Sequence, residues 1–150
     1  DQVNDAKKHG MNNGSVGLNS NPSSALVLQL QHSMKLNEMC QQHRADHAKA
    51  YDEGLKDIVA IPPRQGKHSW SKYVIRTDKR NKLMRFMSQD QIETKIHYAK
   101  LLPQYKMYHK HKLYPVASKL AETSLSLPID PWMTNNERDS VIHYVRRYFT

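Results

Sequence analysis

The sequence predicts an α+β fold, in which a long helix precedes a small, largely antiparallel sheet with helices packed on one face. The first observation is a helical repeat of apolar residues from about Pro22 to about Leu55. The second is the segment Ile92–Tyr98, whose alternating apolar and polar residues are typical of a strand with one buried face. The third is that helical patterns flank this segment, which places the 92–98 strand at the centre of the sheet.

These patterns divide the chain into three parts. Residues 1–21 are polar and rich in Asn and Gly, and they are predicted to form a loop segment. Asn21 and Pro22 suit the cap and first position of a helix over residues 22–56. A helix of this length is typical of an element that bridges two domains or two subunits. Residues 57–150 are predicted to form a small α+β domain.

Turn residues and helix caps delimit the elements of that domain. In chain order they are a strand at Ile58–Ile61, a strand at Trp70–Arg76, a helix at Asp78–Gln91, the strand at Ile92–Tyr98, a helix at Pro115–Leu125, an extended segment at Leu125–Ile129 and a final helix. Thr134 caps the final helix, and Glu137 completes a capping box with it.

Composition and charge limit the function classes. The 150 residues are 38% hydrophobic and 25% charged, which is ordinary for a soluble globular protein. No apolar run is long enough to span a membrane, the N-terminus does not resemble a signal peptide, and a single cysteine fits a reducing, cytoplasmic compartment. The net charge of +9 favours an anionic partner. Because the basic residues are dispersed, a solvated surface is the preferred interpretation over a nucleic-acid patch.

The residues alone give only weak support to three kinds of site: a metal site, a reactive cysteine and an anion-binding loop. His109 and His111 form an H-x-H pair, but no acidic residue or cysteine stands at ligand spacing, so no metal site is predicted. Cys40 lies within the long helix and is predicted to be a packed thiol. The loop over residues 14–21 leads into a helix N-terminus, which either binds an anion or is an ordinary capped loop.

Five segments in sequence resemble the DegT/DnrJ/StrS family of pyridoxal-phosphate-dependent sugar aminotransferases, in its C-terminal part. They are His9–Gly10 with Gly17–Asn21, Arg44 with Ala48 and Tyr51–Leu55, His68–Trp70 with Arg76–Arg80, Ile92–Tyr98, and Ala117–Ala121 with Leu125–Ile129. The first resembles the family's G-x-N-x-R, and the fourth its G-I-x-T-x-I-H-Y. Together these segments cover essentially the whole chain.

The resemblance implies an amino transfer from an amino acid, usually glutamate, to a keto sugar carried on a nucleotide diphosphate. It implies that residues 1–21 end a large upstream domain, that the long helix joins this domain to a small one, and that the enzyme is a homodimer. Asn19, with Asn21 beside it, is expected to reach the pyridoxal phosphate of the neighbouring subunit. His97 and Tyr98 are expected to bind the substrate.

The chain also departs from the family pattern. The lysine that attaches the cofactor lies upstream in the family and has no counterpart here, so no catalytic residue is expected in this chain. The absence of an initiating Met at Asp1 suggests a processed or truncated product. Asn21 stands where the family has Arg. These departures leave open a non-catalytic binding or interaction module on the same fold. A basic nucleic-acid binder is a further alternative, which rests only on the net charge of +9 and the loop rich in Tyr and Lys.

Overall fold

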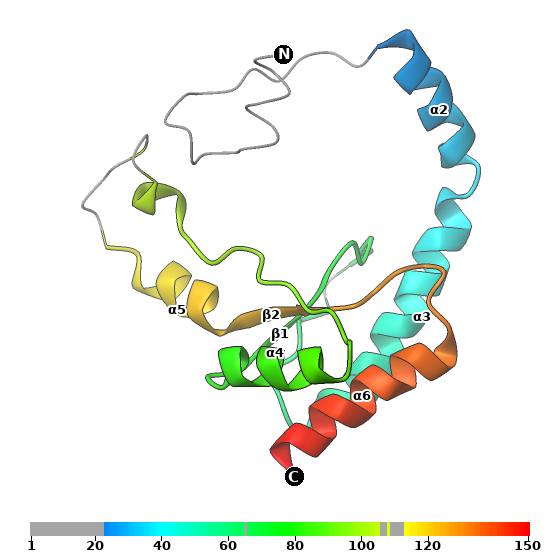
Figure 1. Cartoon of the computed structure of the whole chain (residues 1–150). Coiled ribbons are helices and arrows are strands. Elements are labelled where there is room, and N and C mark those ends of the chain that lie inside the picture. The colour runs from blue at the N-terminus through cyan, green and yellow to red at the C-terminus, as the bar shows by residue number, and fades with distance from the viewer. Residues whose placement is uncertain (1–22, 65, 106–107, 109–112) are drawn as a thin grey trace.

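A computed structural model of the chain describes residues 23–64, 66–105, 108 and 113–150. Within them lie helices α2 (Ser24–Met34), α3 (Asn37–Leu55), α4 (Arg80–Gln89), α5 (Pro115–Thr123) and α6 (Asn135–Phe149), the 3-10 helix η2 (Leu102–Gln104), and strands β1 (Tyr73–Arg76) and β2 (Ser124–Leu127). Figure 1 shows the small sheet among the helices. This arrangement confirms the predicted α+β fold.

The sheet pairs β1 with β2 in antiparallel register, from Tyr73 opposite Leu127 to Arg76 opposite Ser124. Strand β1 lies within the predicted strand Trp70–Arg76, whereas β2 begins at Ser124, one residue before the predicted extended segment Leu125–Ile129 and within the range predicted for the preceding helix. Tyr73 and Ile75 point into the core, which follows from the two-residue repeat of a strand.

The prediction of a central strand at Ile92–Tyr98 is wrong. Of this segment, only Lys95 forms a bridge, with backbone hydrogen bonds to Ser126 of 3.1 and 2.8 Å. A longer antiparallel ladder would next place Glu93 opposite Pro128, which has no N–H to donate. The strand expected at Ile58–Ile61 is likewise only a bridge, between Ala60 and Arg76.

The long helix is interrupted at Lys35 and Leu36, so the prediction of one continuous helix is also wrong. The N–H groups of these residues bond to carbonyls three residues earlier, which tightens the last turn of α2. None of the residues of α2 is buried, and Figure 1 shows this helix standing away from the sheet. Helix α3 buries His47, Ala48, Tyr51 and Leu55. Only the second half of the predicted helix therefore has packing partners within the described chain.

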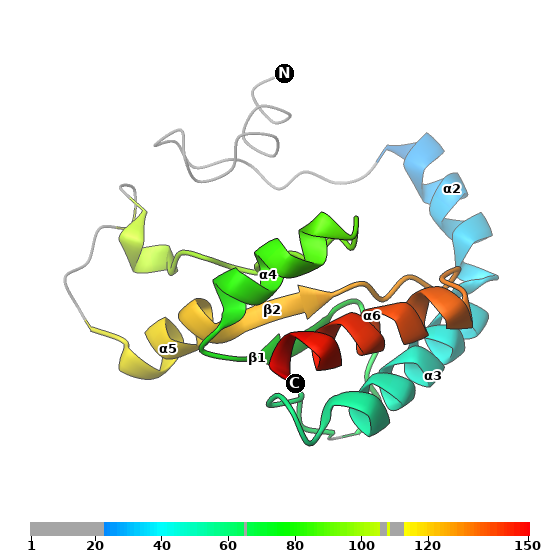
Figure 2. The same cartoon turned by 60° about the horizontal axis from the view of Figure 1, so that its bottom comes forward.

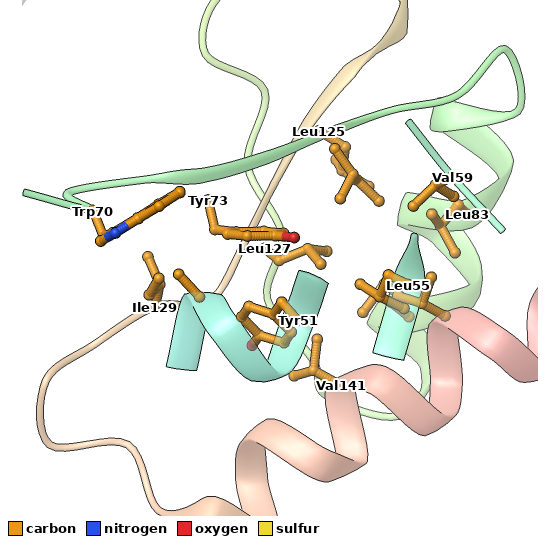
Figure 3. Close-up of a cluster of buried hydrophobic side chains, with 14 residues drawn as sticks. Tyr51, Leu55, Val59, Trp70, Tyr73, Leu83, Leu125, Leu127, Ile129 and Val141 are labelled. Carbon is orange, nitrogen blue, oxygen red and sulfur yellow. The ribbon is translucent and has the colours of Figure 1, made fainter. Parts of the chain in front are cut away.

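The core lies between the sheet and helices α3, α4 and α6. Figure 3 shows it as a continuous cluster that includes Tyr51, Tyr73, Leu83 and Leu125. Helix α6 runs along α3, as Figure 2 shows. The two helices meet at Gly54, where an added Cβ atom would lie 2.7 Å from Cγ2 of Ile142. Glycine thus permits the close approach of α3 and α6.

The predicted start of the last helix is confirmed. Thr134 is its N-cap, with the hydroxyl accepting a 3.2 Å hydrogen bond from the N–H of Glu137, and the Glu137 carboxylate accepts one of 2.7 Å from the N–H of Thr134. This reciprocal pair satisfies donors that the first turn of a helix leaves open.

Candidate functional site

A cavity of about 760 Å³ opens beside the point where the 92–98 segment meets β2. Its walls come from the residues before β1, from the segment after α4, from the end of β2 with the loop that follows, and from the first turns of α6. The lining side chains that can donate or accept hydrogen bonds, carry charge or stack with a ligand include Ser71, Lys72, Lys95, His97, Ser126 and Trp132. A cavity of this size and mixed polarity is suited to a small-molecule ligand.

His97 is fixed in this wall by Ser126. Its Nδ1 atom lies 2.9 Å from the Ser126 hydroxyl, and the ring is half-buried. Burial lowers the pKa of His97 below 6.5, and the positive charges of Lys72 and Lys95 lower it further. At neutral pH the ring is therefore uncharged, with one nitrogen engaged by Ser126 and the other able to donate to or accept from a ligand.

Tyr98 presents an exposed ring beside His97. The ring is 68% exposed, and its centroid is 5.5 Å from that of His97 at an angle of 82°. The ammonium of Lys72 is 5.8 Å from the centroid of the Tyr98 ring, within the range of a cation–π contact. The structure thus brings the two sequence-predicted substrate residues together with Lys72. Nothing in the sequence distinguishes Lys72 from the other basic residues, since its position beside Tyr98 depends on tertiary packing.

Two carboxylates of the cavity wall already have partners in the chain. Glu93 forms an ion pair of 3.0 Å with Lys95. Asp130 accepts a 2.9 Å hydrogen bond from the backbone N–H of Trp132. The ring of Trp132 is 63% exposed at the cavity, and it meets the ring of His43 edge-on at 6.5 Å.

The described part of the cavity does not fit pyridoxal phosphate. A cofactor phosphate is commonly bound by free N–H groups at a helix N-terminus. The helix N-terminus at this cavity belongs to α6, where the carboxylate of Glu137 already occupies the position that an anion would take. Asn19 and Asn21, the residues expected to reach the cofactor, lie outside the described residues.

Three buried aromatic rings contact one another in the core, and one of them is hydrogen-bonded to the cavity wall. The rings of Tyr51 and Tyr73 lie 4.9 Å apart, and Trp70 follows at 5.9 Å from Tyr73 (Figure 3). The Tyr51 hydroxyl donates a 2.7 Å hydrogen bond to the carbonyl of Pro128, which lines the cavity. Burial raises the pKa of both tyrosines, so both stay protonated at neutral pH. The Tyr51 hydrogen bond ties helix α3 to the cavity wall at Pro128.

The remaining histidines form no further site in the described ranges. His43 and His47 are four residues apart on α3, and Nδ1 of His43 lies 3.0 Å from the carbonyl oxygen of Pro131. The described residues contain no group of three or more potential metal ligands. The pair His109 and His111 lies outside them. None of the described helices has the length and apolar character needed to cross a membrane.

Comparison with known proteins assigns the family. Residues 2–146 match the model of the DegT/DnrJ/EryC1/StrS aminotransferase family. A pleiotropic regulatory protein of Geobacillus stearothermophilus is 25% identical over 133 residues, covering 85% of this chain and 36% of the relative. A dTDP-3-amino-3,6-dideoxy-alpha-D-galactopyranose transaminase of Aneurinibacillus thermoaerophilus is 28% identical over 112 residues, covering 71% of this chain and 31% of the relative. The chain thus spans about a third of these relatives.

Solved structures share the fold. A DegT/DnrJ/EryC1/StrS aminotransferase from Brucella abortus superposes with a TM-score of 0.81 at 24% identity, over 99% of this chain and 43% of that one. DesV of S. venezuelae, solved with a ketimine intermediate, gives 0.81 at 23% identity over 89% and 38% of the two chains. On the match over residues 2–146, this chain belongs to the DegT/DnrJ/EryC1/StrS aminotransferase family.

Proposed function

We propose that this chain is the C-terminal portion of an aminotransferase that moves an amino group from an amino acid, glutamate in the first instance, to a keto sugar linked to a nucleotide diphosphate. The observation that carries the proposal is the family match over residues 2–146. A relative named as a transaminase of a dTDP-linked sugar supports the substrate class. Such an enzyme belongs to the biosynthesis of amino sugars, including those of polysaccharides.

The division of the chain follows from the same proposal. Residues 1–21 would end a large upstream domain, residues 22–56 would connect the two domains, and residues 57–150 would form the small domain. The exposed apolar side chains of α2 support this division, since Leu26, Leu28 and Leu30 are each more than half exposed in the described chain. Leu26 and Leu30 share one face of the helix and Leu28 lies on the opposite face, so α2 exposes apolar side chains on more than one side, and such surface is normally covered by another domain or subunit.

Within the small domain, His97 and Tyr98 are the residues proposed to contact the substrate. His97 offers a neutral ring held by Ser126, and Tyr98 offers an exposed ring with a hydroxyl. These groups suit hydroxyl and carbonyl groups of a sugar. Pyridoxal phosphate is proposed as the cofactor, bound mainly by the upstream domain, with Asn19 and Asn21 at its phosphate in a homodimer. A cytoplasmic location is proposed from the single cysteine.

The first test is covalent trapping of the cofactor. The 150-residue chain is incubated with pyridoxal phosphate and borohydride, and the modified lysines are mapped by mass spectrometry. We expect only weak labelling spread over several lysines, because the lysine that attaches the cofactor is proposed to lie upstream. Specific labelling of one lysine would contradict that part of the proposal.

The second test is the DNA sequence immediately upstream of the codon for Asp1. A reading frame that encodes a large α/β domain with a lysine for the cofactor supports the aminotransferase. The alternative is a non-catalytic binding module on the same fold, and Asn21, in place of the family's Arg, favours it. An upstream domain in which that lysine is replaced would decide for the alternative.

A further inference from the structure

We propose that Lys72 binds the diphosphate group of the ligand that occupies the cavity at His97. The inference rests on the proposed function for the identity of the ligand as a nucleoside diphosphate compound. It adds a residue that neither the sequence motifs nor the family match singles out.

The charges of the cavity wall leave Lys72 as the cation that is available to a ligand. Three basic side chains line the cavity: Lys72, Lys95 and His97. Lys95 is paired with Glu93 at 3.0 Å, and His97 is engaged with the Ser126 hydroxyl. Among the described residues, none places a carboxylate within 4.0 Å of the Lys72 ammonium, which lies 5.8 Å from the centroid of the Tyr98 ring.

The acidic side chains of the same wall form no ion pair with Lys72. Glu93 is paired with Lys95, Asp130 accepts from the N–H of Trp132, and Glu137 accepts from Thr134 at the start of α6. Only Glu93 is charge-compensated, by Lys95, whereas Asp130 and Glu137 accept hydrogen bonds from neutral N–H groups and keep their negative charge. Lys72 itself is in no ion pair and lies beside two polar rings, a combination that can bind a phosphate group attached to a sugar.

The backbone before β1 holds Lys72 in this place. Trp70 adopts a left-handed conformation with φ of 49°, which is disfavoured for a bulky residue and persists only where the surroundings enforce it. The Trp70 ring is buried, with the Arg64 guanidinium 4.9 Å from the ring centroid. The backbone N–H of Trp70 donates a 2.9 Å hydrogen bond to Nδ1 of His68. The turn fixed in this way delivers Ser71 and Lys72 to the cavity at the start of β1.

The test is a binding titration of the 150-residue chain with thymidine diphosphate, pyrophosphate and thymidine as separate probes. Binding is followed by the amide NMR signals of residues 71–73 and 95–98, and by the intrinsic fluorescence, to which Trp132 in the cavity wall and the buried Trp70 contribute. We expect both diphosphates to bind and thymidine to bind far more weakly. Lys72→Met should weaken the diphosphates by about tenfold or more, since it removes a charge-assisted contact.

Two matched variants control the experiment. Lys72→Arg keeps the positive charge and should retain binding to within a few-fold. Lys82→Met removes an exposed lysine of α4 that does not line the cavity, and it should leave binding unchanged. The unfolding curves of all three variants should overlay that of the unsubstituted chain, so that lost binding is not lost folding.

Three outcomes would overturn the inference. They are equal binding of thymidine diphosphate by the unsubstituted chain and Lys72→Met, thymidine binding as tightly as its diphosphate, and no binding of either diphosphate. The absence of diphosphate binding overturns the inference because every residue of the proposed site belongs to this chain, so the 150-residue chain contains the whole site. None of these outcomes decides the proposed function, which the borohydride and upstream-DNA tests address without involving Lys72.

Discussion

The Nδ1 atom of His97 lies 2.9 Å from the hydroxyl oxygen of Ser126, on the residue of β2 that also bridges the backbone of Lys95. This side-chain contact continues the attachment of the 92–98 segment to the sheet after its backbone pairing has ended. It also fixes the orientation of a ring in the wall of the cavity. The architecture of the sheet and the geometry of the candidate site therefore depend on the same serine.

Ser126→Ala should reduce the free energy of unfolding by about 1 kcal/mol, because the half-buried His97 ring loses its hydrogen-bond partner. Chemical denaturation followed by circular dichroism measures the change. Ser71→Ala is the matched control, since Ser71 is an exposed serine of the same cavity. An equal effect of the two substitutions would show that the Ser126 contact contributes nothing specific.

Lys72→Met should raise the pKa of His97 towards 6.5 without restoring it fully. The positive charge of Lys72 is a secondary cause of the lowered pKa, and burial is the largest. The titration of the His97 ring protons by NMR measures the shift. A pKa that stays fixed or moves down would mean that Lys72 does not lie beside His97 in solution.

The buried His47 should make the stability of the domain depend on pH. Burial, followed by the positive charge of Arg138, lowers its pKa in the folded state below 6.5. As the pH falls through 6.5, the unfolded chain takes up a proton that folded His47 resists, so the free energy of unfolding decreases until the folded-state pKa is reached.

Urea denaturation at about pH 7.5 and about pH 5.5 measures this loss. His47→Gln should reduce the loss, whereas His32→Gln, at an exposed position of α2, serves as the control for an unspecific effect. A loss that is unchanged in His47→Gln would assign the pH dependence to other groups.

Gly54→Ala should destabilise the domain although alanine is the better helix former by about 1 kcal/mol. Its Cβ atom would lie 2.7 Å from Cγ2 of Ile142, so α3 and α6 would have to move or the isoleucine would have to shift. In an Ile142→Ala background the same substitution should become neutral or stabilising. A double-mutant cycle by urea denaturation measures the coupling, and purely additive effects would show that the two helices are not in contact there.

Arg80→Met should reduce the free energy of unfolding by about 1.5 to 3 kcal/mol, as expected for a lost hydrogen bond from a charged group. Arg80 is 9% exposed, and its guanidinium donates a 2.5 Å hydrogen bond to the carbonyl of Ala121, which ties the start of α4 to α5. Arg85→Met, on the exposed face of α4, should change stability by less than about 0.5 kcal/mol. Thermal and urea denaturation of the pair provide the measurement.

Leu28→Glu should leave the unfolding of the small domain unchanged and reduce self-association of the chain. Leu28 is 67% exposed on α2, which buries none of its residues. A charge at this position opposes burial of the helix against a second copy. Light scattering coupled to gel filtration, over a range of concentrations, measures the effect. A fully monomeric unsubstituted chain would remove the basis of this prediction.

The local signals in the sequence were sufficient for most helices and for the fold class. The capping box of Thr134 and Glu137 placed the start of α6 at the right residue, because a cap is a contact between residues three apart. The helices α4 and α5 lie within their predicted ranges for a similar reason. His97 and Tyr98 could be singled out from their motif, and the structure places both at a cavity wall or beside it.

Only the tertiary structure decided which predicted elements found partners. The alternation of apolar and polar residues in 92–98 indicates a face that is suited to burial. A strand also needs a neighbouring strand whose N–H groups can pair with its carbonyls, and Pro128 has no N–H group. The helical repeat in the sequence continues through Lys35 and Leu36. Of the two helices that it forms, however, α3 packs against α6 and the sheet, whereas α2 buries none of its residues. The meeting of Lys72 with Tyr98, far apart in the chain, likewise depends on packing. Patterns of neighbouring residues encode local geometry and burial, whereas contacts between distant segments depend on the whole fold.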